Sequence, residues 1–164
     1  MYTIRATQKV LKRLGARTPA AQHSSTTALG DWYCNIVRLG ARQLALCTSD
    51  RSLLCVVLPA RGLKSQIGEH LPQGLAAVLA ALDVAPAAIA RELKEMEQCV
   101  VAATENRSVL GSMKDFALAI DCLLYAREDL PLLDLALELA ATRCGPLHYD
   151  HPADVARRML ERPN

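Results

Sequence analysis

The segment from Asn106 to Asp115 carries the polar side chains best suited to chemistry in this chain of 164 residues. Ser112 and Asp115 have the spacing of a capping box, in which a serine and an acidic residue satisfy the first N–H groups of a helix. The same helix start, preceded by Arg107 and Ser108, offers free N–H groups and positive charge to an anion. Two interpretations are therefore open: a structural cap, or a site for a phosphate or carboxylate group.

A second set of distinctive residues lies on an expected strand that follows Gly30. Side chains alternate between the two faces of a strand, so Trp32 and Asn35 point to opposite sides. We expect Trp32, the sole tryptophan, to anchor the core. Asn35 either ties its strand to a loop or lines a polar pocket with Asn106 and Arg107. The candidate ligand-binding residues are then Asn35, Asn106, Arg107, Ser108 and Ser112.

The elements that would position these residues form an α+β pattern with the order β-α-β-β-β-α-α-β-α-α-α. The expected strands are 2–6, 31–39, 43–49, 52–58 and 99–104, and residues 16–30 form a loop. The expected helices are 8–14, about 67–82, 86–98, 113–127, 132–142 and 152–162.

Short joints between the three strands after Gly30 require antiparallel hairpins, so we expect a mostly antiparallel sheet of about five strands covered by helices. The strand 52–58 is continuously apolar, which predicts a central strand covered on both faces. Pro72 and Gly74 predict a break or a kink in the helix that follows it.

Four groups of letters in the sequence are unusually specific. They are Arg5-x-Thr7-x-Lys9-x-x-Lys12, Gly30-Asp31-Trp32-Tyr33-Cys34-Asn35, Thr48-Ser49-Asp50-Arg51 and the segment from Asn106 to Asp115. Together they resemble a family of uncharacterised prokaryotic proteins, a domain of unknown function, over residues 2–124. This chain departs from the pattern at Ala6, Ser49 and Lys114, where Cys, Asn and Asn are usual. The resemblance implies one α+β domain over 1–127 and a helical C-terminal extension over 128–164, packed on it or at an interface.

Charge is distributed unevenly, although the formal net charge is only +2. Residues 1–64 contain ten Lys or Arg and two Asp or Glu, whereas residues 65–164 contain nine and fifteen. A basic cluster surrounds the first expected helix: Arg5, Lys9, Lys12, Arg13 and Arg17. It either meets nucleic-acid phosphates or forms a solvated face. The aromatic content of 4% lacks the stacking platforms of single-strand binders.

The composition excludes several other classes of protein. A membrane-spanning helix needs roughly 20 apolar residues, and the longest uncharged apolar stretch, 70–82, has 13. The opening residues lack the apolar segment of an export signal, so we expect a cytoplasmic protein with six reduced cysteines. No cysteine spacing matches a zinc site, and Cys144, His148, Asp150 and His151 form no closed set of ligands. We therefore expect no metal and no cofactor.

Three functions are left open. The first is a small binding or regulatory module that holds an anionic ligand at the loop 106–112. The second is a protein-interaction or antitoxin-like subunit that buries the apolar helix 132–142 against a partner or a second copy, through residues 130–143. The third is an enzyme on phosphorylated or nucleic-acid substrates, in which Asp31, Asp50 or Asp115 acts as acid, base or metal ligand.

Overall fold

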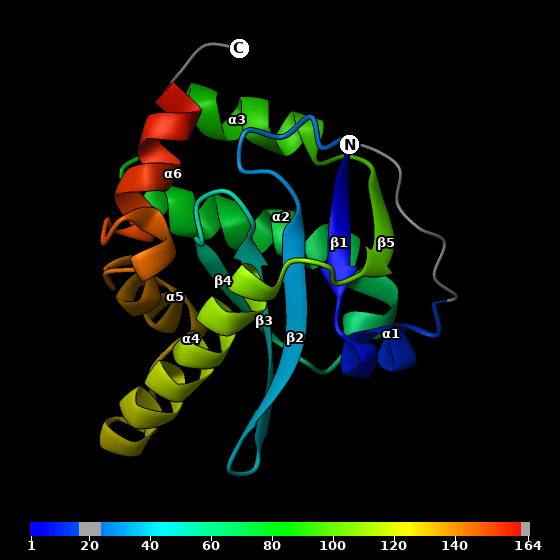
Figure 1. The fold of residues 1–164 in the computed structure, drawn as a ribbon, viewed down its shortest axis with the longest axis vertical. Helices are drawn as coiled ribbons and strands as arrows, with labels where there is room; N and C mark the ends of the chain where they lie inside the picture. Colours follow the sequence, from blue (N-terminus) through cyan, green and yellow to red (C-terminus); the bar gives the residue numbers. More distant parts are fainter. Residues whose placement is uncertain (17–23, 162–164) are drawn as a thin grey trace.

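The computed structural model describes residues 1–16 and 24–161, which form an α+β fold with a five-stranded sheet between helices (Figure 1). The strands are β1 (Tyr2–Ala6), β2 (Trp32–Leu39), β3 (Arg42–Ser49), β4 (Cys55–Pro59) and β5 (Cys99–Ala103). The helices are α1 (Gln8–Leu14), α2 (Leu63–Ala81), α3 (Pro86–Glu95), α4 (Arg107–Ala126), α5 (Leu132–Ala140) and α6 (Pro152–Glu161). The order along the chain differs from the expected one by a 3-10 helix, η1 (Gly145–Leu147), between α5 and α6.

The sheet is mixed, so the prediction of a mostly antiparallel sheet is wrong. Its strands lie in the order β4-β3-β2-β1-β5. The pairs β2–β3 and β3–β4 are antiparallel, as the short joints predict, but β1 is parallel to both β2 and β5. The reason lies in the connections. Helix α1 carries the chain from β1 to β2, and helices α2 and α3 carry it from β4 to β5, so both strands can run in the same direction as β1.

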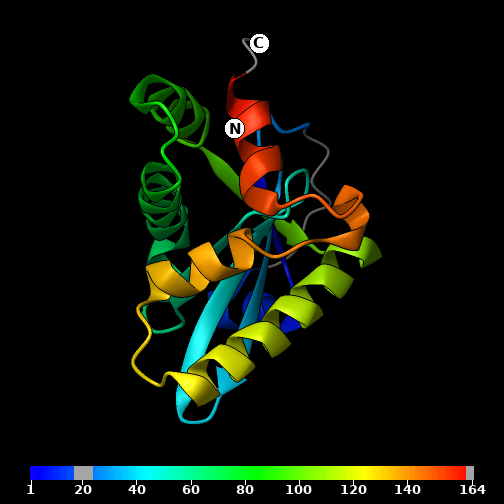
Figure 2. The same ribbon diagram turned by 90° about the vertical axis from the view of Figure 1, so that its left-hand side faces the viewer.

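Strand β4 lies at an edge of the sheet rather than at its centre, which corrects the prediction for 52–58. All of its residues except Pro59 are buried nonetheless. Helix α5 contacts both β4 and α2, and Figures 1 and 2 show α5 beside the β4 edge, between α2 and α4. A helix that covers an edge strand explains a continuously apolar sequence as well as a central position does.

Helix α2 runs for 19 residues through Pro72 and Gly74, so of the predicted break or kink the break is absent. A proline inside a helix costs about 3 kcal/mol, and the buried side chains on either side of it, Leu71 and Leu75, offset that cost. Gly74 has a packing role, because a Cβ there would lie 2.6 Å from a methyl group of Val56. The glycine thus lets α2 approach the sheet closely.

Helices α2 and α4 lie on opposite faces of the sheet (Figure 2). Trp32 is fully buried, which confirms its predicted place in the core. Helix α4 contacts β2 and β3 and buries Val109, Met113, Phe116 and Ile120. Within residues 1–16 and 24–161, no helix combines the length and the apolar content that are needed to cross a bilayer.

The C-terminal helices pack on the rest of the chain. Helix α5 contacts α2, α4 and β4, and α6 contacts α3 and α5. Four residues of α5 are buried inside the protein: Leu135, Ala136, Leu139 and Ala140. Most of the apolar surface that motivated a partner at 130–143 is therefore covered by this chain itself, while Leu133 stays 37% exposed. A contact with a partner there, and a division of the chain near residue 127, stay predictions.

Candidate functional site

The residues predicted at 106–112 belong to the first turns of α4, which begins at Arg107 and not at 113. Asn106 is the N-cap, and its Oδ1 accepts hydrogen bonds from the second and third helical N–H groups at 2.9 and 3.4 Å. The predicted capping box is wrong, because Ser112 lies inside the helix and its Oγ donates to the Ser108 carbonyl at 3.3 Å. Asn106 thus occupies N–H groups that an anion at this helix end would need.

The start of α4 does lie against the strand that carries Trp32. The backbone N–H of Asn106 donates to the Tyr33 hydroxyl at 3.2 Å. Asn35 lies on the same strand, but its Oδ1 accepts a hydrogen bond from the Thr7 hydroxyl at 2.9 Å. This bond ties β2 to the residue that follows β1, which is one of the two roles predicted for Asn35.

The other predicted ligand residues point to different places. Arg107 and Ser108 have exposed side chains, whereas Ser112 lines a small cavity of about 100 Å³ between α4 and the segment that precedes η1. Asp115 and Cys144 line the same cavity. Burial and the Asp115 carboxylate raise the pKa of the Cys144 thiol, so the thiol is protonated at neutral pH. An anion site at 106–112 stays a prediction.

Other distinctive residues of the sequence form a partly buried network of charges beside β1 and β2. The Arg5 guanidinium donates from Nε to Asp31 at 3.1 Å and from Nη2 to Glu105 at 2.9 Å. The Asp31 carboxylate also accepts the N–H of Thr3 at 3.0 Å. Because the Arg5 and Asp31 side chains are each only 10% exposed, each charge depends on the other for compensation.

Asp50 and Arg51 extend this network to the loop that precedes β2. Asp50 accepts the N–H of Asp31 at 3.0 Å, and Arg51 donates to the Thr27 carbonyl at 3.1 Å. Gly30 has a φ of +81°, and a Cβ there would lie 2.0 Å from Asp50 Oδ1. Burial and the adjacent Asp31 carboxylate raise the pKa of Asp50. We call the whole set the Asp31 network: Arg5, Gly30, Asp31, Asp50, Arg51 and Glu105.

The three carboxylates considered for catalysis do not share one site. Asp31 and Asp50 lie together, but the Asp31 oxygens are already engaged by Arg5 and a backbone N–H. Asp115 lines the cavity beside Cys144. In the part of the chain that the structure describes, no three His, Cys, Asp or Glu side chains gather as a metal site requires. An enzymatic role stays a prediction.

Three arginines from distant parts of the sequence line one open hollow of about 460 Å³. Arg13 lies in the last turn of α1, Arg42 opens β3, and Arg61 precedes Gly62, the N-cap of α2. The other lining residues are uncharged: Ala41, Gln43, Leu44, Pro59 and Leu132. None of the three arginines forms an ion pair with a carboxylate within the described ranges. We call this site the arginine hollow.

Neutral oxygen atoms hold two of these guanidinium groups in place. Arg13 Nη1 donates to Gln43 Oε1 at 3.0 Å, and Arg42 Nη1 donates to the backbone carbonyl of Glu128 at 3.2 Å. A neutral acceptor orients a guanidinium without cancelling its charge, and it uses only one of five N–H donors. The remaining donors are available for charge-assisted hydrogen bonds to an anion.

The first turn of α2 adds positive potential beside Arg61. Its N-cap is Gly62, which has a φ of +83° and no side chain to accept a bond from the helix. The first turn contains no acidic residue, and Lys64 is exposed there. Since a helix N-terminus carries roughly half a positive charge, backbone and side chains give this end of the hollow the same sign.

Sequence reasoning missed the arginine hollow, because its arginines are brought together only by the fold. The one available signal was the excess of basic residues in 1–64. Of the predicted basic cluster, Arg13 lines the hollow, Arg5 is buried in ion pairs, and Arg17 lies outside the described residues.

Comparisons with known proteins identify a family for this fold. Neither the curated proteins nor the solved structures contain a match to the chain. A family model described as Domain of unknown function (DUF6933) matches residues 3–155. The match spans α1 to α5 and therefore continues past residue 124, where the resemblance of the motifs ends. The chain belongs to the DUF6933 family.

Proposed function

We propose that this protein is a small binding module for phosphate-type anions and that the arginine hollow holds the anion. The observation that carries the proposal is that Arg13, Arg42 and Arg61 line one hollow with no Asp or Glu among its described lining residues. Like charges that face one hollow repel each other. Neutral oxygens orient Arg13 and Arg42, and no carboxylate of the described residues pairs with any of the three, so the arrangement favours an anionic partner from outside the chain.

The number of arginines favours a phosphate group over a carboxylate. A phosphate presents three oxygens in different directions, so it can accept hydrogen bonds from several guanidinium groups at once. A carboxylate presents two oxygens in one plane, which a single guanidinium can satisfy. The volume of about 460 Å³ also leaves room for more of the ligand than its anionic group.

The proposal is tested by titrating the protein with inorganic phosphate at low ionic strength and following backbone amide shifts by NMR. We expect Arg13→Gln, Arg42→Gln and Arg61→Gln each to weaken binding roughly tenfold, since a hydrogen bond to a charged group contributes about 1.5–3 kcal/mol. Added salt should weaken the binding of the wild-type protein, because ions screen exposed charges.

The matched control is Arg107→Gln, which removes the arginine of the site that the sequence predicts at 106–112. This variant should bind phosphate like the wild-type protein. The opposite pattern, in which Arg107→Gln loses phosphate and the three hollow variants retain it, would assign the anion to the start of α4. A wild-type protein that binds no phosphate would overturn the proposal.

A further inference from the structure

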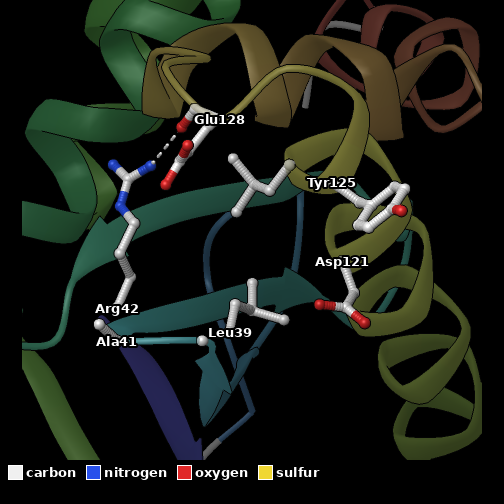
Figure 3. A pocket seen from close by; sticks show the side chains of 8 residues that line it. Leu39, Ala41, Arg42, Asp121, Tyr125 and Glu128 are labelled. Atoms are coloured by element: carbon white, nitrogen blue, oxygen red, sulfur yellow. Dashed lines mark hydrogen bonds between the residues drawn. The ribbon is translucent and has the colours of Figure 1, made fainter.

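A second hollow adjoins the arginine hollow and differs from it in chemistry. It has a volume of about 440 Å³ and lies between the β2–β3 turn and the C-terminal half of α4 (Figure 3). Ala41 and Arg42 line both hollows, so the two meet at these residues. Its other lining residues are Leu39, Gly40, Asp121, Leu124, Tyr125 and Glu128. We call it the tyrosine hollow.

The tyrosine hollow offers the surfaces that a flat ring with amino groups needs. The Tyr125 side chain is 96% exposed, and Leu39 and Leu124 add apolar surface. Asp121 lies one helical turn before Tyr125 and therefore on the same side of α4. Its carboxylate forms no hydrogen bond or ion pair within residues 1–16 and 24–161, so its oxygens can accept from a ligand. Figure 3 shows Asp121 and Tyr125 across the hollow from Arg42.

We infer, on the basis of the proposed anion site, that the ligand is a nucleoside phosphate that spans both hollows. Its phosphate group binds Arg13, Arg42 and Arg61, and its base stacks on Tyr125, as bases stack on aromatic side chains in nucleic-acid complexes. An amino group on the edge of the base donates to Asp121, the pairing that carboxylates make with cytosine. Arg42 holds the junction, because its bond to the Glu128 carbonyl fixes the guanidinium between the two hollows.

The inference is tested by calorimetric titration of the full chain with four compounds: cytidine monophosphate, uridine monophosphate, cytidine and inorganic phosphate. We expect cytidine monophosphate to bind roughly tenfold more tightly than inorganic phosphate, because the base adds its stacking contact. It should bind about threefold more tightly than uridine monophosphate, since only cytosine carries an amino group for Asp121. Asp121→Asn should remove most of that preference.

Variants of the two hollows separate the contributions of ring and anion. Tyr125→Ala should weaken the binding of cytidine monophosphate roughly tenfold, the usual effect of removing a stacking aromatic, and leave inorganic phosphate unaffected. Arg61→Gln should weaken both ligands. The control is Tyr149→Ala, which removes another exposed tyrosine outside the lining of both hollows and should change neither.

The outcomes distinguish this inference from the proposed function. If cytidine monophosphate binds no more tightly than inorganic phosphate, or if Tyr125→Ala binds it like the wild-type protein, the nucleoside assignment fails and the anion module stands. If cytidine binds as tightly as its monophosphate, the phosphate of the nucleotide contributes nothing and the nucleoside phosphate assignment fails, whereas the anion module stands as long as inorganic phosphate binds. Both also fail if neither phosphate compound binds.

Discussion

The Asp31 network and the arginine hollow both rely on arginine, yet they use its charge in opposite ways. Arg5 is buried and pairs with Asp31 and Glu105. The arginines of the hollow are exposed, and their partners within the described chain are neutral oxygens. Neutralised charge fixes the position of strands and loops, whereas oriented charge without a carboxylate remains available to a ligand. The residues that are most distinctive in the sequence belong to the first kind.

The largest effect that we expect is a loss of stability when Asp31 is substituted. Asp31→Asn leaves the buried Arg5 without its internal counter-charge, and breaking a buried pair costs about 3 kcal/mol. Glu105 is the other partner of Arg5, and the Glu105 side chain is 66% exposed. Glu105→Gln should therefore lower the free energy of unfolding by only about 0.5 kcal/mol. Urea unfolding measures both. A loss below about 1 kcal/mol for Asp31→Asn would show that the network is not what holds these strands.

A smaller loss of stability is expected for a substitution of Gly30, because the absence of a Cβ there leaves room for the Asp50 carboxylate. Gly30→Ala places a Cβ against Asp50 Oδ1 in a left-handed backbone conformation, and we expect a cost of about 2 kcal/mol. Gly15→Ala is the control, because Gly15 has a similar φ of +65° but no atom within 4 Å of the added Cβ. It should cost about 1 kcal/mol. Equal shifts in thermal melting would mean that the contact with Asp50 relaxes without cost.

Substitution of an arginine in the arginine hollow should change the stability of the protein very little. Arg61→Gln is expected to change the free energy of unfolding by less than about 0.5 kcal/mol, because Arg61 is exposed and unpaired within the described residues. At low salt the variant should gain stability, since repulsion among the three arginines decreases. Urea unfolding at two salt concentrations measures this. A loss as large as that of Asp31→Asn would assign Arg61 to the framework of the protein.

The smallest effect at neutral pH is expected for Asp50→Asn, since the Asn oxygen can still accept the N–H of Asp31. Folding raises the pKa of Asp50 above its usual 3.8, so the native state binds this proton more readily than the unfolded chain. The wild-type protein therefore gains stability from this residue as pH falls through the raised pKa towards 3.8. The variant lacks that gain. If the unfolding free energies of the wild-type protein and of Asp50→Asn vary with pH in parallel, this reasoning is wrong.

Local patterns predicted the elements better than their pairing. The bounds of β1 and α1 agree with the prediction, because a short strand and a helix that ends at Gly15 are encoded in adjacent residues. The parallel pairing of β1 with β5 was not predictable in this way, since it joins residues nearly one hundred positions apart along the chain. The start of α4 was misplaced because Ser112 and Asp115 imitate a cap that Asn106 provides.

The candidate sites were also hard to predict where they depend on residues that are distant in the sequence. The motif letters around Asp31 and Asp50 were recognisable, but each of these carboxylates accepts a backbone N–H of the chain itself, from Thr3 and Asp31 respectively. Arg13, Arg42 and Arg61 stand in ordinary sequence surroundings, and each is unremarkable until α1, β3 and the start of α2 bring them to one hollow. The charge excess in the first 64 residues is the only trace of this arrangement in the sequence, and a single sequence does not say which arginines share a hollow.

The cover that α5 provides over β4 has a consequence for synthesis of the chain. The ribosome releases β4 before it releases Leu132–Ala140, so the nascent protein carries an apolar strand with an uncovered edge until α5 has emerged. Such an edge recruits neighbouring nascent chains. The sheet of this protein therefore gains the cover of its β4 edge only when α5 packs on it.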